Sequence, residues 1–368
     1  MTNQKIRTIG AAVLVVLWAV LTLGAWFAPA QEISVSERRP LAQFPELSGN
    51  TLLSGKFMFS FEDYTLDQFP LRDTFRRVKS LFHYNILRQK DNNDIYMADG
   101  YAAKLEYPLN EGGVNNALKK LTYVYETYLR DTGSTVFSAV IPDKGYYLAG
   151  ENGYLTMDYE RLFTMAWEAM PWATHIDFTG SLDITDYYFT DTHWRQEKLL
   201  PTAQILAETM GVSGPRQEDF TATKVDKPFY GVYYGQAALP MDPEELYVME
   251  SQLLDECMVY SLDENKNIPV YNMEKLSSND LYDVFLSGPQ SLLRIENPNA
   301  TTGRELIVFR DSFGSSMVPL LVQDYAMVTV VDLRYLPSTV LDKHVDFHGQ
   351  DVLFLFSTLI LNTGSALK

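Results

Sequence analysis

Apolar runs of strand length alternate with segments of helical periodicity along most of the chain. The strand-like runs are Thr135–Ile141, His175–Phe178, Glu305–Phe309, Met327–Val331 and Asp351–Phe356. Apolar residues fall at helical spacing between them, at about 114–128, 159–170, 196–210 and 315–323. Continuous apolar strands separated by amphipathic helices indicate a parallel sheet that is buried on both faces. The pattern therefore predicts an α/β sandwich.

The N-terminal segment, residues 1–31, has a different pattern. An uncharged and mostly apolar run from Thr8 to Ala30 is long enough to cross a hydrocarbon core of about 30 Å as a helix. Lys5 and Arg7 precede this run, so the positive-inside rule predicts a cytoplasmic N-terminus and an extracytoplasmic remainder. Its length favours a membrane anchor. The small residues at 28–30 also fit a signal-peptide cleavage site, which would give a secreted protein.

Three further parts follow from composition. Residues 32–92 form a lead-in, in which prolines predict extended chain as far as Pro70 and apolar spacing then predicts a helix over Arg72–Arg88. Residues 93–368 form the α/β domain. Within it, residues 212–298 break the alternation and are expected to be an insertion beside the sheet, where Lys227–Gly235 suggests a hairpin. Loops and insertions near strand ends often line binding clefts.

Charge and cysteine content exclude several classes of function. The formal net charge of -17 argues against nucleic acid or an anionic membrane surface as the main partner, because both would repel an acidic face. Cys257 is the only cysteine of the 368 residues, so an intramolecular disulfide and a multi-cysteine metal site are both excluded. Neutral glycans and small molecules remain as candidate ligands.

The segment Asp311–Gly314 lies where an apolar strand runs into a helix. Ser312 is thus expected at the carboxyl edge of the sheet, where α/β proteins keep their ligand sites. The free N–H groups of the following helix can stabilise an oxyanion after a serine has attacked a carbonyl. A serine needs a base and an orienting acid to act as a nucleophile. His193 is the candidate base and Asp191 the candidate acid.

Other interpretations of these residues stay open. An Asp-x-His segment is often a capped turn with a surface imidazole, and Asp-Ser-Phe-Gly is a common loop composition. A metal site is a second interpretation, with Asp191, His193 and the pair His344 and His348 as ligands. Four further residues are candidate substrate contacts: Trp194, Arg310, Lys144 and Tyr233. The alternatives are an anchor of its own loop for Trp194, crowding of the serine turn for Arg310, a solvated turn for Lys144 and core packing for Tyr233.

The motif Asp191-Thr-His-Trp194, followed by Arg310-Asp-Ser-Phe-Gly314, resembles the DHHW family and the related alginate O-acetylation proteins. Supporting matches cover nearly the whole extracytoplasmic part, at 37–41, 67–70, 93–96, 141–144, 331–335 and 351–354. Two positions depart from the family patterns. Thr192 stands where the family name has a second histidine, and Arg310 replaces the glycine usual before Asp-Ser in SGNH hydrolases.

The resemblance implies an SGNH hydrolase-like three-layer sandwich with a circularly rearranged, parallel central sheet. It also implies Ser312 as nucleophile, His193 as base and Asp191 as orienting acid, with no cofactor. The expected function is serine-dependent acyl transfer, and by the resemblance acetyl transfer, to a cell-surface or secreted polysaccharide. The expected partners are that polysaccharide, a multi-spanning membrane O-acyltransferase and the membrane itself. A carbohydrate esterase, a non-catalytic glycan-binding or assembly scaffold and a metal-dependent hydrolase are the alternatives.

Overall fold

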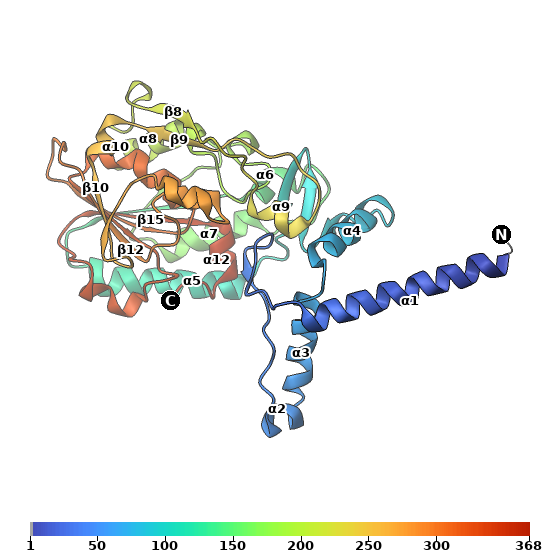
Figure 1. Cartoon of the computed structure of the whole chain (residues 1–368). Helices are drawn as coiled ribbons and strands as arrows, with labels where there is room; N and C mark the ends of the chain where they lie inside the picture. The colour runs from blue at the N-terminus through green and yellow to red at the C-terminus, as the bar shows by residue number, and fades with distance from the viewer. Residues whose placement is uncertain (1–2) are drawn as a thin grey trace. The chain divides into compact units, whose positions relative to one another are not determined.

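The computed structural model describes residues 3–368, which divide into two compact units (Figure 1). The smaller unit comprises Met1–Gln89 with Gly235–Pro240, and the larger comprises Lys90–Tyr234 with Met241–Lys368. The elements of the smaller unit are α1 (Asn3–Phe27), β1 (Ile33–Ser34), β2 (Arg39–Pro40), α2 (Gly49–Leu53), α3 (Lys56–Asp67) and α4 (Arg72–Asn85).

The apolar helix expected at the N-terminus is present as α1. Its segment Gln4–Phe27 has a mean hydropathy of 2.3, and length and composition make it a candidate membrane span. The lead-in differs from the extended chain expected up to Pro70, because α3 runs over twelve residues. No proline falls between Lys56 and Asp67, so no missing backbone N–H interrupts this helix. The helix expected from Arg72 is present as α4.

An eight-stranded sheet forms the centre of the larger unit, in the order β11-β10-β12-β14-β13-β15-β6-β7. Five of these strands, β14 to β7 in that order, are parallel to one another, whereas β12, β10 and β11 continue the sheet in antiparallel pairs. The strands are β6 (Thr135–Ile141), β7 (Thr174–Ile176), β10 (Met258–Ser261), β11 (Lys266–Ile268), β12 (Leu292–Glu296), β13 (Glu305–Arg310), β14 (Met327–Val331) and β15 (Asp351–Ser357).

Helices cover both faces of the sheet, so the larger unit has three layers (Figure 1). Alternate residues of β13 enter different cores: Leu306 and Val308 pack with α8 (Leu200–Thr209) and α10 (Gln252–Glu256), whereas Ile307 and Phe309 pack with α5 (Glu111–Val124), α7 (Tyr159–Ala169) and α12 (Thr358–Thr363). Burial on both faces explains why these strands are apolar throughout.

Shorter elements complete the larger unit. They are β3 (Asp91–Asn92), β4 (Ile95–Ala98), β5 (Tyr101–Lys104), α6 (Lys144–Leu148), β8 (Thr221–Lys224), β9 (Tyr247–Glu250) and α11 (Gly314–Met317); α9 (Val232–Ala237) continues into the smaller unit. Short helices of other types are η1 (Tyr125–Leu129), η2 (Ile184–Asp186), η3 (Gln196–Lys198), η4 (Gln217–Asp219), η5 (Met273–Ser277), η6 (Leu281–Val284), η7 (Val318–Asp324) and η8 (Ser338–Lys343).

The segment 212–298 differs from its prediction in two respects. It does not lie only beside the sheet, because β10, β11 and β12 are strands of the sheet itself. The hairpin expected over Lys227–Gly235 is also absent, because the chain there enters α9. This stretch lies between the two strands of the antiparallel pair β8 and β9. Gly231 and Gly235 allow close approach of the chain to other backbone rather than a tight turn between strands.

Candidate active site

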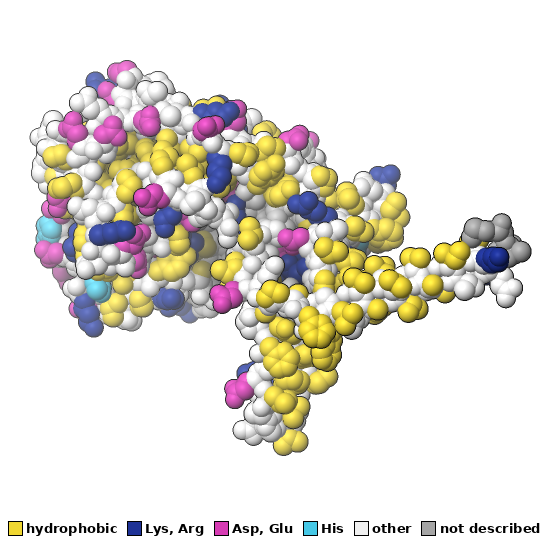
Figure 2. Space-filling view, viewed as in Figure 1, with side chains coloured by type: hydrophobic (Ala, Val, Ile, Leu, Met, Phe, Trp, Pro, Cys, Tyr) yellow, Lys and Arg dark blue, Asp and Glu magenta, His cyan; other side chains and the backbone are white. Residues whose placement is uncertain are grey.

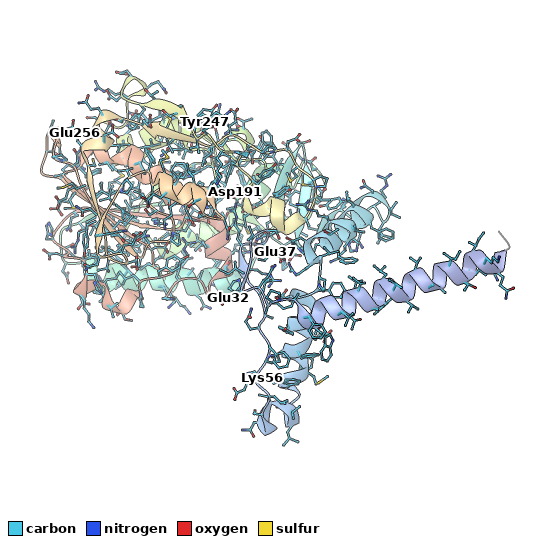
Figure 3. The ribbon with its side chains drawn as sticks, in the orientation of Figure 1. Glu32, Glu37, Lys56, Asp191, Tyr247 and Glu256 are labelled. Atoms are coloured by element: carbon cyan, nitrogen blue, oxygen red, sulfur yellow. The ribbon has the colours of Figure 1, made fainter. Side chains whose placement is uncertain are left out.

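Two loops from distant parts of the sequence meet at the carboxyl edge of the sheet. Ser312 lies in the turn between β13 and α11. The loop that carries Asp191 (labelled in Figure 3) and His193 is closed by a β-bridge between Tyr187 and Trp194 and by a hydrogen bond from the Tyr188 N–H to the His193 carbonyl. The structure therefore brings together the three residues that the sequence had suggested for nucleophilic chemistry.

Hydrogen bonds join these three side chains in a row. His193 Nδ1 lies 2.6 Å from Asp191 Oδ1, and His193 Nε2 lies 2.8 Å from Ser312 Oγ. Asp191 is fully buried and His193 nearly so, whereas Ser312 is partly open to solvent. A carboxylate on Nδ1 favours the tautomer in which Nε2 is free to accept the serine proton.

The carboxylate of Asp191 is held by two further donors. Oδ1 accepts a hydrogen bond of 3.0 Å from the backbone N–H of His193, and Oδ2 accepts one of 2.8 Å from the N–H of Val232. The close approach of the second segment requires Gly231, because a Cβ atom there would lie 2.3 Å from the Asp191 backbone. The insertion thus fixes the orientation of the acid.

A second carboxylate, that of Asp311, fixes the turn that carries Ser312. Asp311 Oδ1 accepts from the Phe313 N–H at 3.0 Å, and Oδ2 accepts from the backbone N–H and the hydroxyl of Ser357 at 2.8 and 2.6 Å. Ser357 ends β15, the neighbouring strand. The position of the serine is therefore tied to two adjacent strands of the sheet.

An aromatic ring from the segment 212–298 covers the imidazole. Tyr282 stacks on His193 with a ring separation of 3.8 Å and an interplanar angle of 4°. The Tyr282 hydroxyl lies 2.8 Å from Ser316 Oγ, and the same Oγ accepts a hydrogen bond of 2.9 Å from Trp194 Nε1. Burial raises the pKa of Tyr282 well above its usual value, so this hydroxyl stays protonated.

Lys144 and Glu244 hold the segment that leads into the loop. Lys144 Nζ donates to the carbonyls of Tyr188 and Phe189 at 2.9 and 3.3 Å, and Glu244 accepts from the N–H groups of Phe189 and Thr190. Burial lowers the pKa of Lys144 to about 7 and raises the pKa of Glu244. Both groups support the loop from the side of the protein interior.

The four side chains predicted to contact substrate are all in the interior. Trp194, Arg310, Lys144 and Tyr233 are each at most 5% exposed. Trp194 Nε1 also donates to the Phe313 carbonyl, Arg310 forms an ion pair with Asp332, and the Tyr233 hydroxyl donates to Thr192 Oγ1. Because none of them offers an exposed surface to a glycan, we assign them to supporting the two loops.

The alternative metal site does not assemble. Asp191 and His193 bond to each other and to Ser312, whereas His344 follows the end of η8 and His348 lies near Glu305 and Asp346. Within residues 3–368, no group of three or more His, Cys, Asp or Glu side chains is suited to hold a metal ion. The short helix η8 ends at Lys343, before both of these histidines, so they do not share a helix face.

Sequence patterns had not indicated the residues that position the site. Tyr282, Val232 and Glu244 come from a segment without regular periodicity, so nothing in the sequence connects them with the loop at 191–194. Asp311 had a usable signal, because a carboxylate directly before a strand-end serine is well placed to accept from the following N–H.

A family profile covers the part of the chain that holds the candidate active site. The profile of the family described as DHHW protein matches residues 182–331, a range that includes both loops. The resemblance to the DHHW family is confirmed. No curated protein matches the chain.

Solved structures show the same fold at low sequence identity. A DHHW family protein from Eubacterium siraeum is 21% identical with a TM-score of 0.53, over 76% of this chain and 93% of its own. Bacillus cereus PatB1 is 18% identical with a TM-score of 0.55, over 74% of this chain and 98% of its own. The structure of Bacillus cereus PatB1 with a sulfonyl adduct is 17% identical with a TM-score of 0.53, over 74% of this chain and 96% of its own. The predicted SGNH hydrolase-like α/β fold, with a large and mostly parallel central sheet, is confirmed.

Proposed function

We propose that this DHHW-like protein transfers an acyl group, acetyl by the family resemblance, to hydroxyl groups of an extracytoplasmic polysaccharide, with Ser312 as the nucleophile. The observation that carries the proposal is the row of hydrogen bonds from Asp191 through His193 to Ser312. Serine, imidazole and carboxylate in this geometry are the components of acyl transfer through a covalent intermediate.

The reaction has two halves. In the first, the Ser312 Oγ proton passes to His193 Nε2 as Oγ attacks the donor carbonyl, and the tetrahedral oxyanion then expels the leaving group, which takes the proton from Nε2. In the second, Nε2 removes the proton of a sugar hydroxyl, whose oxygen attacks the acyl-serine ester. The glycan ester leaves and Ser312 regains its proton. The imidazolium formed in each half is stabilised by the Asp191 carboxylate.

Two further observations support the proposal. PatB1, which shares the fold, has been solved with a sulfonyl adduct, and sulfonyl electrophiles are captured by activated nucleophiles. The apolar helix α1, with Lys5 and Arg7 before its hydrophobic part, fits an anchor that leaves the α/β unit outside the cytoplasm. A multi-spanning membrane acyltransferase, implied by the resemblance, would supply the acyl donor there.

Covalent labelling tests the nucleophile. The full-length protein in detergent is treated with a sulfonyl fluoride or fluorophosphonate, and the modified peptide is mapped by mass spectrometry. We expect labelling at Ser312, lost in Ser312→Ala and His193→Ala. Ser315→Ala is the matched control, since Ser315 is a buried serine of the same turn region and should leave labelling intact. Absence of labelling in the folded protein would favour the non-catalytic scaffold.

A second measurement separates transferase from esterase. p-Nitrophenyl acetate serves as donor and neutral oligosaccharides serve as acceptors, and the products are identified by mass spectrometry. Acetylated oligosaccharide supports the proposal. Release of acetate alone, with full labelling of Ser312, would identify a carbohydrate esterase, because water then resolves the acyl-enzyme.

A further inference from the structure

The helix α4 has its amphipathic faces reversed relative to a helix that packs on a protein core. Its apolar stripe consists of Phe75, Val78, Phe82 and Ile86, and these side chains are 46 to 65% exposed. The stripe recurs at helical spacing, which normally marks the face that is buried against a core. Phe75 contacts Phe69 of the same unit, whereas Val78, Phe82 and Ile86 remain 49 to 65% exposed.

The opposite, polar face of α4 is the one that packs. Ser80 is fully buried and donates a hydrogen bond of 2.8 Å to the Ala237 carbonyl, and Arg76 donates to the Gly235 carbonyl at 2.9 Å. Arg72 and Arg76 also pair with Glu37 (labelled in Figure 3). The polar contacts of the helix are therefore used within the smaller unit, and the apolar stripe remains for something outside it.

Other exposed apolar side chains of this unit lie on α2 and α3. Leu53 is 91% exposed, Phe59 72%, and Met58 and Leu66 each more than 60%. Figure 2 shows hydrophobic side chains over much of α1, α2 and α3. Exposed apolar surface of this extent marks an interaction site rather than ordinary solvent-facing surface.

The candidate anchor is continuous with this apolar surface. A cavity of about 660 Å³ is lined by α1 between Trp18 and Trp26 and by Phe44, Phe61 and Tyr64 from the lead-in. Trp18 and Trp26 are about 12 Å apart along the helix axis. With α1 across a bilayer, its last turns occupy the outer interface, and the residues on the other side of this cavity lie at the same depth.

Local charge favours lipid over a second protein. The segment 72–88 carries five basic side chains, Arg72, Arg76, Arg77, Lys79 and Arg88, against the single acid Asp73, in a chain of net charge -17. Arg77, Lys79 and Arg88 are exposed. Basic residues beside an apolar stripe are typical of helices that lie in the headgroup region, where the stripe reaches about 5–10 Å toward the acyl chains.

We propose that α3 and α4 lie in the headgroup region of the bilayer that α1 crosses, with Phe59 and Phe82 among the lipid chains. The lead-in is then a second membrane contact, in addition to the anchor. This contact does not depend on the chemistry of Ser312.

Site-specific fluorescence tests the proposal on the full-length protein. Cys257 is first replaced by serine, and single cysteines are introduced as Phe82→Cys, Phe59→Cys or Leu155→Cys and labelled with the polarity-sensitive dye NBD. Leu155 is the matched control, a 59% exposed aliphatic residue of the larger unit. Each protein is reconstituted into phosphatidylcholine and phosphatidylglycerol vesicles, with or without lipids that carry a doxyl quencher on the acyl chain.

We expect blue-shifted emission at positions 82 and 59 and loss of most of that emission with doxyl lipid, with neither effect at position 155. Emission at 82 and 59 that matches the control would overturn the proposal. Blue-shifted emission that doxyl lipid does not quench would also overturn it, since a second copy of the chain or another protein would then cover the stripe.

Discussion

Replacing Asp191 by asparagine tests the role of the buried acid with little change in shape. In the native protein, Oδ1 accepts from Nδ1–H and the backbone N–H of His193, while Oδ2 accepts from the Val232 N–H. An amide has one acceptor oxygen and one donor nitrogen. Neither orientation of the asparagine can therefore satisfy all three donors.

The two orientations have different consequences. With the amide oxygen toward His193, the NH2 group faces the Val232 N–H, and a buried donor without a partner costs about 1–3 kcal/mol. With the oxygen toward Val232, the NH2 group donates to Nδ1, which forces the proton onto Nε2 and leaves no acceptor for the Ser312 hydroxyl. A wrong tautomer in a serine triad reduces the rate by about 10⁴-fold, or about 5.4 kcal/mol in the activation free energy.

We therefore expect Asp191→Asn to lower the rate of Ser312 acylation by about 100- to 10,000-fold, depending on how the two orientations share the population. The assay is the pre-steady-state burst of p-nitrophenol from p-nitrophenyl acetate, with the acyl-protein confirmed by intact mass. Asp342→Asn, at an exposed carboxylate, is the control and should leave the burst rate unchanged. A folded Asp191→Asn protein that keeps more than about a tenth of the native rate would refute the reasoning, because its tautomer then does not limit acylation.

Three other predictions concern the residues around the proposed catalytic groups Asp191, His193 and Ser312. Burial lowers the pKa of Lys144 from 10.5 to about 7, so between these pH values the unfolded chain holds one more proton, and the free energy of unfolding should rise with pH by up to about 1.4 kcal/mol per unit. Urea denaturation across this range should show that slope in the native protein relative to Lys144→Met, and equal slopes would contradict the burial argument. Gly231→Ala places a Cβ atom 2.3 Å from the backbone of Asp191 and should cost about 1–3 kcal/mol of stability and slow the acylation of Ser312. Gly180→Ala, whose Cβ atom meets nothing within 4 Å, should do neither. Tyr282→Ala removes the ring stacked on the imidazole and should lower kcat/KM by about 100-fold, while Tyr282→Phe keeps the stack and should stay within a few-fold; equal losses would assign the effect to the hydroxyl instead.

The parallel part of the sheet was predictable because four of its five strands, all except the edge strand β7, are buried on both faces. Thr135–Ile141, Met327–Val331 and the β13 and β15 runs are continuous apolar segments with the same or nearly the same bounds in the structure. The antiparallel strands β10 and β12 were not predicted. In β12 the charged residues Arg294 and Glu296 occupy exposed positions, and in the four-residue strand β10 the exposed residue Met258 is apolar and the buried Ser261 is polar. Burial on one face alone leaves a weaker pattern.

The site residues were predictable only where a reactive side chain lies next to a predicted strand end or close in sequence to its partner. Ser312 follows an apolar strand and His193 is two residues from Asp191, so local sequence was enough to suggest them. The contact between Tyr282 and His193, and that between Val232 and Asp191, join segments far apart along the chain. No local periodicity encodes such contacts, which arise from tertiary packing.

The stack of Tyr282 on His193 restricts how reactants can approach the base. One face of the imidazole is covered by the parallel ring, and Phe313 lies 4.9 Å from the imidazole centre at a tilt of 59°. In the acyl transfer that we propose, the in-plane edge at Nε2 serves the departing group of the donor and the incoming acceptor in turn. That proposal predicts bisubstrate kinetics of the ping-pong type, with parallel lines in double-reciprocal plots of rate against donor at several acceptor concentrations.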